Sequence, residues 1–192
     1  MRRGLPLPAA IVLASCGAGA VPPSLAHPLA GAAAPEFQRE STDAREVGVP
    51  GSDRTKATIV DFWASWCGAC QETMPALDKL WRDRREEGLM VIGVSVDEVP
   101  DEAVAMAEHL GASFPVVLDP HQRLAATYGV AKVPLTFVVD RVGTVRWVGR
   151  DPSAARRAVD VLLAEGTPPP SAAGLRAPRA AGLRGPRAAR SE

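Results

Sequence analysis

Two cysteines, Cys67 and Cys70, closely follow an apolar run and constrain the fold more than any other feature of the chain. The run, residues 57–63, reads ATIVDFW and predicts a strand that is buried on both faces. From Cys70 onward, apolar residues recur at three- and four-residue steps, which predicts a helix that starts at the cysteines. A thiol at a helix N-terminus lies near unpaired N–H groups and the positive end of the dipole, and both favour the thiolate. The spacing therefore indicates a pair that exchanges disulfides, with Cys67 attacking and Cys70 resolving.

The rest of the core pattern alternates strands with helices. Early alternation implies parallel strands, and two late strand-like runs around a short loop ending in Gly143 predict an antiparallel hairpin. We therefore expect an α/β fold with a mixed central sheet flanked by helices. The expected strands cover residues 89–96, 114–119, 135–139 and 144–148, and the expected helices cover 100–110, 122–128 and a segment that begins at Pro152 after an Asp151 cap.

The first 26 residues are typical of a bacterial signal region. A basic start precedes a short apolar stretch, residues 5–14, which is too short to span a bilayer. Residues 13–16, LASC, resemble a lipobox, in which cleavage before Cys16 leaves a cysteine that carries lipid. Residues 24–26, SLA, instead fit an ordinary signal peptidase site with cleavage after Ala26. Either interpretation predicts export, and the lipobox also explains the odd third cysteine and predicts a membrane anchor.

Composition divides the remainder into three parts. Residues 27–56 are rich in Ala, Pro and charge, and we expect them to form a linker. The regular pattern predicts one domain over residues 57–166. A near-repeated octad with Gly, Pro and Arg predicts a disordered tail over residues 167–192. The formal net charge is zero, so no global charge signal points to a nucleic-acid partner.

Four local features make the core resemble a thioredoxin-fold protein. Residues 60–70, VDFWASWCGAC, are similar to the thioredoxin active-site signature, with Ala69 where Pro is usual. Pro75 lies where the family kinks this helix, and residues 133–137, VPLTF, resemble its cis-proline loop. A longer segment over residues 97–128 resembles the αβ insertion of the exported, often membrane-tethered TlpA/ResA branch.

Two features depart from that branch. Thr73 stands three residues after the second cysteine, where the branch commonly carries Glu. The branch's N-terminal hairpin has no evident counterpart before Ala57. Asp61 instead matches the buried acid of ordinary thioredoxins.

The resemblance and the local chemistry together suggest roles for the site residues. Asp61, on the strand that leads into the site, is the candidate proton acceptor for Cys70, because burial raises a carboxyl pKa. Pro134 is the expected cis-proline, and Val133 is expected to pair with a bound client peptide. Trp66, Gly68 and Ala69 are expected to border the client, with Gly68 and Ala69 also tuning the potential through the helix start.

These features favour a thiol–disulfide oxidoreductase of the bacterial envelope or periplasm, with the Cys67–Cys70 disulfide as its redox group and no separate cofactor. The resemblance implies a reductant of client proteins, for example apocytochrome c, that is supplied with electrons by a membrane thiol transporter. A disulfide-forming oxidase or isomerase, or a copper(I)-binding envelope chaperone, are the alternatives. A zinc site is disfavoured because the chain has no second cysteine pair and no suitably spaced His. The pair's place between a strand and a helix disfavours a purely structural disulfide.

Overall fold

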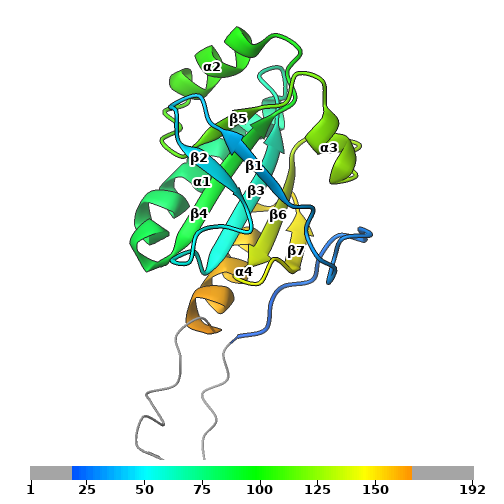
Figure 1. Ribbon diagram of the computed structural model, residues 1–192, viewed down its shortest axis with the longest axis vertical. Helices are drawn as coiled ribbons and strands as arrows, with labels where there is room; N and C mark the ends of the chain where they lie inside the picture. The colour runs from blue at the N-terminus through cyan, green and yellow to red at the C-terminus, as the bar shows by residue number, and fades with distance from the viewer. Residues whose placement is uncertain (1–18, 166–192) are drawn as a thin grey trace, which may run out of the picture.

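The computed structural model describes residues 19–165, which form a five-stranded mixed sheet between two layers (Figure 1). Helices α1 and α4 cover one face, while a separate hairpin and α3 lie against the other. The elements are β1 (Phe37–Glu40), β2 (Glu46–Val49), β3 (Ala57–Trp63), α1 (Gly68–Arg84), the 3₁₀ turn η1 (Arg85–Glu87), β4 (Leu89–Ser95), α2 (Pro100–His109), β5 (Val116–Leu118), α3 (Arg123–Thr127), β6 (Leu135–Asp140), β7 (Val145–Gly149) and α4 (Pro152–Glu165).

The sheet has the order β5-β4-β3-β6-β7, with β3 at its centre. All seven residues of β3 are buried, as the continuous apolar run predicts. Strands β3, β4 and β5 are parallel, whereas β6 and β7 run antiparallel to their neighbours. The predicted mixed sheet and late hairpin are therefore confirmed, and β3 delivers the chain to the cysteines from the middle of the core.

Local chemistry explains where the two longest helices, α1 and α4, begin and where α1 ends. Helix α1 starts directly after Cys67, contains Pro75, and passes through η1 to Gly88, whose left-handed φ of 105° suits glycine. Helix α4 begins at Pro152, where the Asp151 carboxylate accepts a 2.9 Å hydrogen bond from the Ser153 N–H group. Both helices bury an apolar stripe against the sheet.

The prediction of a linker over residues 27–56 is wrong. Strands β1 and β2 pair antiparallel within this stretch and bury Phe37, Val47 and Val49 in the main core. Phe37 packs edge-on against Tyr128, whose hydroxyl donates a 2.8 Å hydrogen bond to the Pro35 carbonyl. The pattern was missed because each strand has only four residues, so no apolar period extends far enough to be recognised. A hairpin thus does precede Ala57.

An N-terminal strap, residues 21–34, follows the outer edge of β7, the last strand of the sheet. The Pro23 carbonyl accepts a 3.1 Å hydrogen bond from the Trp147 indole N–H, and the Ser24 hydroxyl accepts one of 3.1 Å from the Val148 N–H. The Leu25 N–H in turn donates to the Val148 carbonyl at 2.8 Å. Further along, the strap forms an antiparallel bridge at Ala33. It therefore satisfies edge groups of β7 that would otherwise face solvent.

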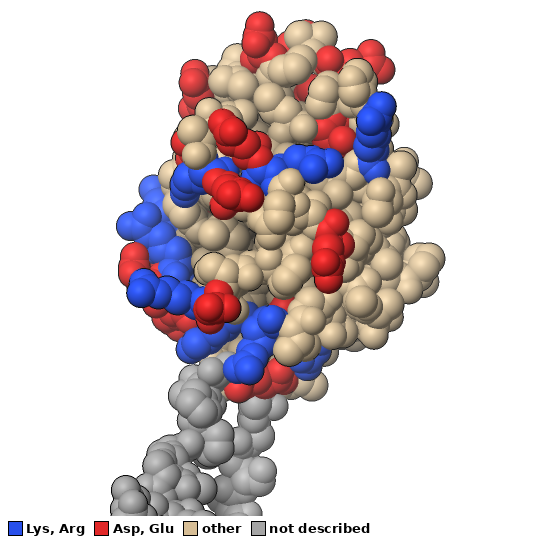
Figure 2. All heavy atoms as spheres, viewed as in Figure 1, with Lys and Arg blue, Asp and Glu red and all other residues tan. Residues whose placement is uncertain are grey.

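Acidic and basic side chains are intermixed on the face seen in Figure 2. Acidic groups gather at the end of the molecule where α2 lies, and α2 carries the exposed Asp101 and Glu102 in its first turn. Within residues 19–165, none of the helices has the length and apolar character needed to cross a membrane.

Candidate active site

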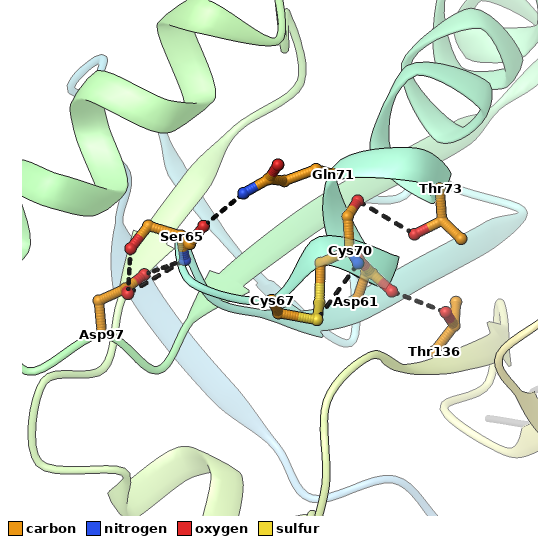
Figure 3. The surroundings of a disulfide bond; sticks show 8 residues. All are labelled: Asp61, Ser65, Cys67, Cys70, Gln71, Thr73, Asp97 and Thr136. Carbon is orange, nitrogen blue, oxygen red and sulfur yellow. Dashed lines mark hydrogen bonds between the residues drawn. A yellow bond between two sulfur atoms is a disulfide. The ribbon is translucent and has the colours of Figure 1, made fainter.

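Cys67 and Cys70 form a disulfide at the N-terminus of α1 (Figure 3). Cys67 is the N-cap residue of the helix, with extended backbone, and its sulfur accepts a 3.2 Å hydrogen bond from the Cys70 N–H group. Cys67 is 8% exposed and Cys70 is 1% exposed, so the first sulfur is the one that a partner reaches. The helix end that supports this N–H contact also stabilises negative charge on the Cys67 sulfur after reduction.

The loop that carries Cys67 presents a mostly exposed border to solvent. The Trp66 side chain is 68% exposed, an unusual position for a large aromatic group, and Gly68 and Ala69 are exposed on the first helical turn. A shallow groove of about 360 Å³ lies between Trp66 and α2. Its lining includes Ser65, Trp66, Glu102, Ala105, Met106 and His109. The exposed residues Trp66, Gly68 and Ala69 therefore flank the cysteines in sequence, and the groove adjoins the disulfide loop at Ser65 and Trp66.

Asp61 lies on β3 with its carboxyl group buried beneath α1. Side chains alternate along a strand, and Phe62 packs with Tyr128 on the opposite face of the sheet, so Asp61 is directed to the face that α1 covers. The residue is 2% exposed, and burial raises the pKa of its carboxyl group to about 7. The Thr136 hydroxyl donates a 2.6 Å hydrogen bond to Asp61 Oδ1, which acts in the opposite direction on that pKa.

The Val133–Pro134 segment lies directly before β6, and its peptide bond is cis, as predicted. Because Leu135 pairs with Phe62 in the antiparallel register, this segment reaches the sheet where β3 ends. Pro134 is buried and Val133 is half-buried. The structure therefore brings the proline loop and the cysteine loop to the same end of the sheet.

Thr73 occupies the position where the resemblance leads one to expect an acid. Its hydroxyl donates a 3.2 Å hydrogen bond to the Cys70 carbonyl, so it remains within the helix rather than supplying a titratable group. Asp61 is then the carboxyl group placed beneath the first turn of α1. Cys16 lies outside the described residues. Among residues 19–165, no group of three or more His, Cys, Asp or Glu side chains is arranged to hold a metal ion.

Thr136 is a site residue that the sequence analysis did not identify. It pairs directly with Asp61 across β3 and β6, so its hydroxyl and the carboxyl group share one face of the sheet. A threonine inside an apolar strand is an ordinary strand residue, and only the strand register gives it a partner. Thr136 belongs to the VPLTF segment, but nothing in the sequence indicates that it contacts Asp61, which lies 75 positions earlier.

Several ResA proteins, which are thiol-disulfide oxidoreductases, match the chain over part of their length. A thiol-disulfide oxidoreductase ResA from Geobacillus thermodenitrificans is 31% identical over 116 residues, which cover 60% of this chain and 66% of that protein. A ResA protein from Bacillus thuringiensis is 32% identical over 90 residues, which cover 47% of this chain and 52% of the relative. The chain thus spans between half and two thirds of the length of these relatives.

Solved structures share the fold over more than nine tenths of their own length. A Chlorobium tepidum protein provisionally designated thiol:disulfide interchange protein DsbE superposes with a TM-score of 0.60 and 26% identity, covering 69% of this chain and 97% of that one. A thiol:disulfide interchange protein from a Bacteroides species gives a TM-score of 0.62 with 20% identity, covering 72% and 92%. The fold is therefore thioredoxin-like, as predicted.

The sequence profile of the AhpC/TSA family matches residues 30–148, more than half of the chain. The match begins before β1 and ends within β7, so it includes the hairpin, the cysteine pair, Asp61 and the cis-proline loop. On this evidence the chain belongs to the AhpC/TSA family of thioredoxin-fold proteins.

Proposed function

We propose that this chain is an exported thiol–disulfide oxidoreductase that reduces disulfides in client proteins through Cys67 and Cys70. One observation carries the proposal: the two cysteines form a disulfide at the N-terminus of α1, with the more exposed sulfur at the N-cap. The likeness to ResA and DsbE proteins supports the same chemistry. The redox-active disulfide itself is the electron carrier, and the proposal needs no further cofactor.

In the reducing direction, the Cys67 thiolate attacks a client disulfide. A mixed disulfide forms between Cys67 and one client sulfur, and the other client sulfur leaves as a thiolate. Cys70 then loses its proton and attacks the Cys67 sulfur, which forms the Cys67–Cys70 disulfide and releases the second client thiolate. Two electrons pass from the pair to the client. A membrane thiol transporter is the proposed donor that reduces the pair again.

Asp61 is the proposed acceptor for the Cys70 proton. An ordinary Asp is fully ionised at neutral pH and is a weak base. With its pKa raised to about 7, Asp61 is divided between carboxylate and carboxylic acid near neutrality, which suits repeated proton transfer. The Thr136 hydroxyl fixes the carboxyl group by holding Oδ1. Burial of Cys70 makes such help valuable, because bulk water has little access to its sulfur.

Client contacts are proposed for the exposed ring around the disulfide. Trp66 supplies apolar surface, and Gly68 and Ala69 allow a client chain to approach the sulfurs. Val133, beside the buried Pro134, offers backbone groups at the adjacent sheet end. An extended client segment that carries a disulfide fits this surface, and apocytochrome c is the proposed example in cytochrome c maturation.

We further propose a lipid anchor at Cys16 in the bacterial envelope. The strap supports cleavage before Cys16 over cleavage after Ala26. Cleavage after Ala26 would remove the contacts that Pro23, Ser24 and Leu25 make with β7, whereas cleavage before Cys16 would keep them. Mass spectrometry of the mature N-terminus, together with a Cys16→Ser variant, tests this: a diacylated Cys16 supports the anchor, and a mature chain that begins at His27 contradicts it.

A glutathione redox titration of the purified protein tests the proposed activity. Reduction potentials of related pairs range from roughly −270 mV for reductants to about −120 mV for strong oxidants. A value near the first, together with catalysis of insulin reduction that Cys67→Ser abolishes, supports the reductant. A value near the second supports an oxidase. Tight copper(I) binding without insulin reduction would instead indicate a metal chaperone.

A further inference from the structure

We infer that Asp97 is a positioning residue for the cysteine pair, acting through the backbone of Ser65. Asp97 follows β4 and lies 32 positions beyond Ser65 in the sequence, yet the two residues are joined by three hydrogen-bond contacts (Figure 3). This inference rests on the proposed role of Cys67 as the nucleophile. It concerns what holds the loop in front of that nucleophile.

The Asp97 carboxylate accepts hydrogen bonds from Ser65, which follows β3, and from Ser95, which ends β4. Its oxygens accept from the Ser65 N–H group at 3.0 and 2.9 Å, and Oδ1 accepts from the Ser65 hydroxyl at 2.7 Å. Oδ2 accepts a further hydrogen bond of 2.7 Å from the Ser95 hydroxyl. Asp97 is 2% exposed, and within residues 19–165 it forms no ion pair. A buried carboxylate that is matched to neutral donors alone is a costly arrangement unless its geometry is used.

Ser65 is held on its other side as well. Its carbonyl accepts a 2.7 Å hydrogen bond from the Gln71 side-chain amide on α1 (Figure 3). Two side chains therefore fix all three polar groups of Ser65. Asp97, after β4, accepts from its N–H group and hydroxyl, and Gln71, on α1, donates to its carbonyl. The next residue, Trp66, has no such support from packing, because most of its side chain is exposed. The order of the loop before Cys67 thus depends on Ser65.

The anchoring of Ser65 affects how strongly the helix N-terminus stabilises the Cys67 thiolate. A thiolate at the helix N-terminus is stabilised only while it stays close to the first-turn N–H groups, since the effect fades within one turn. The disulfide fixes that position in the oxidised protein. After reduction the covalent link is gone, and the anchored Ser65 adds to the backbone hydrogen bonds that hold Cys67 at the helix end, from the Cys67 N–H group to the Ala64 carbonyl at 3.2 Å and from the Gln71 N–H group to the Cys67 carbonyl at 3.1 Å. Loss of the anchor should therefore raise the pKa of the Cys67 thiol and make the pair's potential more negative.

The main test is Asp97→Asn. An amide has one acceptor oxygen, so it cannot accept from Ser65 on both atoms, while its size is unchanged. We expect the iodoacetamide reaction of reduced Cys67 at pH 6 to slow by about threefold to tenfold, in line with a weakened helix-end interaction. The apparent pKa of thiolate absorbance should rise, and the glutathione titration should shift towards a more reducing pair. An unchanged or faster reaction overturns the inference, because loss of a negative charge alone would favour the thiolate.

Asp78→Asn is the matched control. Asp78, within α1, is also buried and accepts from the N–H group and hydroxyl of one serine, Ser113, at 2.7 and 2.6 Å, and unlike Asp97 it also pairs with Arg82 at 3.0 Å. Ser113 lies on the loop after α2 and not on the cysteine loop. It should reduce stability and leave the Cys67 pKa and the potential unchanged. An equal shift in this control would show that both variants act through general loosening and would overturn the inference.

Ser65→Ala keeps the test decisive should Asp97→Asn fail to fold. It removes only the hydroxyl contact and preserves the backbone bonds, so a shift of about twofold in the same direction is expected. No shift would contradict the inference. A wild-type protein whose Cys67 shows no lowered pKa would instead contradict the proposed nucleophile, which separates the two failures.

Discussion

Thr136 donates a 2.6 Å hydrogen bond to the buried carboxyl group of Asp61, its direct cross-strand neighbour between β3 and β6. This contact is the one polar interaction recorded for the Asp61 side chain within residues 19–165, where burial is the dominant influence on its pKa. The hydroxyl partly offsets the cost of a buried charge. The pair therefore sets how readily Asp61 exchanges a proton near neutral pH.

Asp61→Asn should slow the resolving step more than the initial attack. An amide of the same shape cannot accept the Cys70 proton, while Cys67 remains at the helix end. General-base contributions of this kind are typically a hundredfold or more. Stopped-flow measurement of mixed-disulfide formation and decay with a fluorescent disulfide peptide separates the two steps. Equal slowing of both would count against the proton-acceptor role.

Thr136→Val should shift the pH profile of that resolving step upward. The hydroxyl stabilises the charged form of Asp61, so its removal raises the carboxyl pKa further above 7. Charged hydrogen bonds contribute roughly 1.5–3 kcal/mol, which corresponds to an upward shift of about one unit or more. The rate of mixed-disulfide decay between pH 5 and 9 measures it. A profile that stays in place would show that another group sets the observed pKa.

The stability of the oxidised protein should fall as pH rises from about 4 to 7. The pKa of Asp61 increases on folding from 3.8 to about 7, so the native state binds more protons than the unfolded state in this window. The loss levels off above pH 7 at roughly 4 kcal/mol or less. Asp61→Asn should lack this decline and gain on the wild type at pH 8. Urea unfolding of both proteins at pH 4 and pH 8 measures the difference, and parallel behaviour would contradict it.

Shortening the chain to begin at His27 should destabilise the domain. The truncation removes the three hydrogen bonds that Pro23, Ser24 and Leu25 form with β7. At about 0.5–1.5 kcal/mol each, the loss is roughly 1.5–4.5 kcal/mol relative to a chain that begins at Gly19. Thermal unfolding of the two oxidised proteins gives the comparison. Equal melting temperatures would mean that the strap adds nothing to the fold.

Trp66→Ala should weaken client recognition with little effect on stability. The side chain is 68% exposed, and substitutions at such positions usually change stability by less than about 0.5 kcal/mol. We expect a higher KM for a protein disulfide and an unchanged rate with a small linear disulfide such as bis(2-hydroxyethyl) disulfide. Steady-state assays with both substrates distinguish these effects. A parallel loss with both would place Trp66 in support of the cysteine loop instead.

Sequence reasoning succeeded where a residue's role depends on its immediate neighbours. The run at residues 57–63 matches β3 at both ends, because seven consecutive apolar or buried residues leave few alternatives. The start of α1 at the cysteines and the Asp151 cap at the start of α4 follow from local chemistry in the same way. The Val133–Pro134 bond and the buried position of Asp61 came from resemblance to a known pattern, and the structure agrees with both.

What escaped prediction depends on contacts between distant segments. The four-residue strands of the hairpin are stabilised by Phe37 meeting Tyr128, which no local pattern reveals. The same holds for Asp97, whose partner Ser65 is brought close only by the parallel pairing of β3 with β4. The strap was predicted to belong partly to the signal region, residues 21–26, and partly to the linker, residues 27–34, and its contact with Trp147 becomes evident only once β7 occupies the sheet edge.

The strap also limits how far this domain can stand from a bilayer. Its first packed residue, Val21, is five positions after Cys16, and five extended residues span about 17 Å. A lipid on Cys16 would therefore keep the packed part of the domain within about 17 Å of the anchored residue, close to the lipid headgroups. The described chain enters at the end of the sheet opposite α2 and the cysteines (Figure 1). With so short a connection, the Cys67–Cys70 sulfurs would lie on the side of the domain that faces away from the bilayer, where client proteins arrive from the aqueous phase.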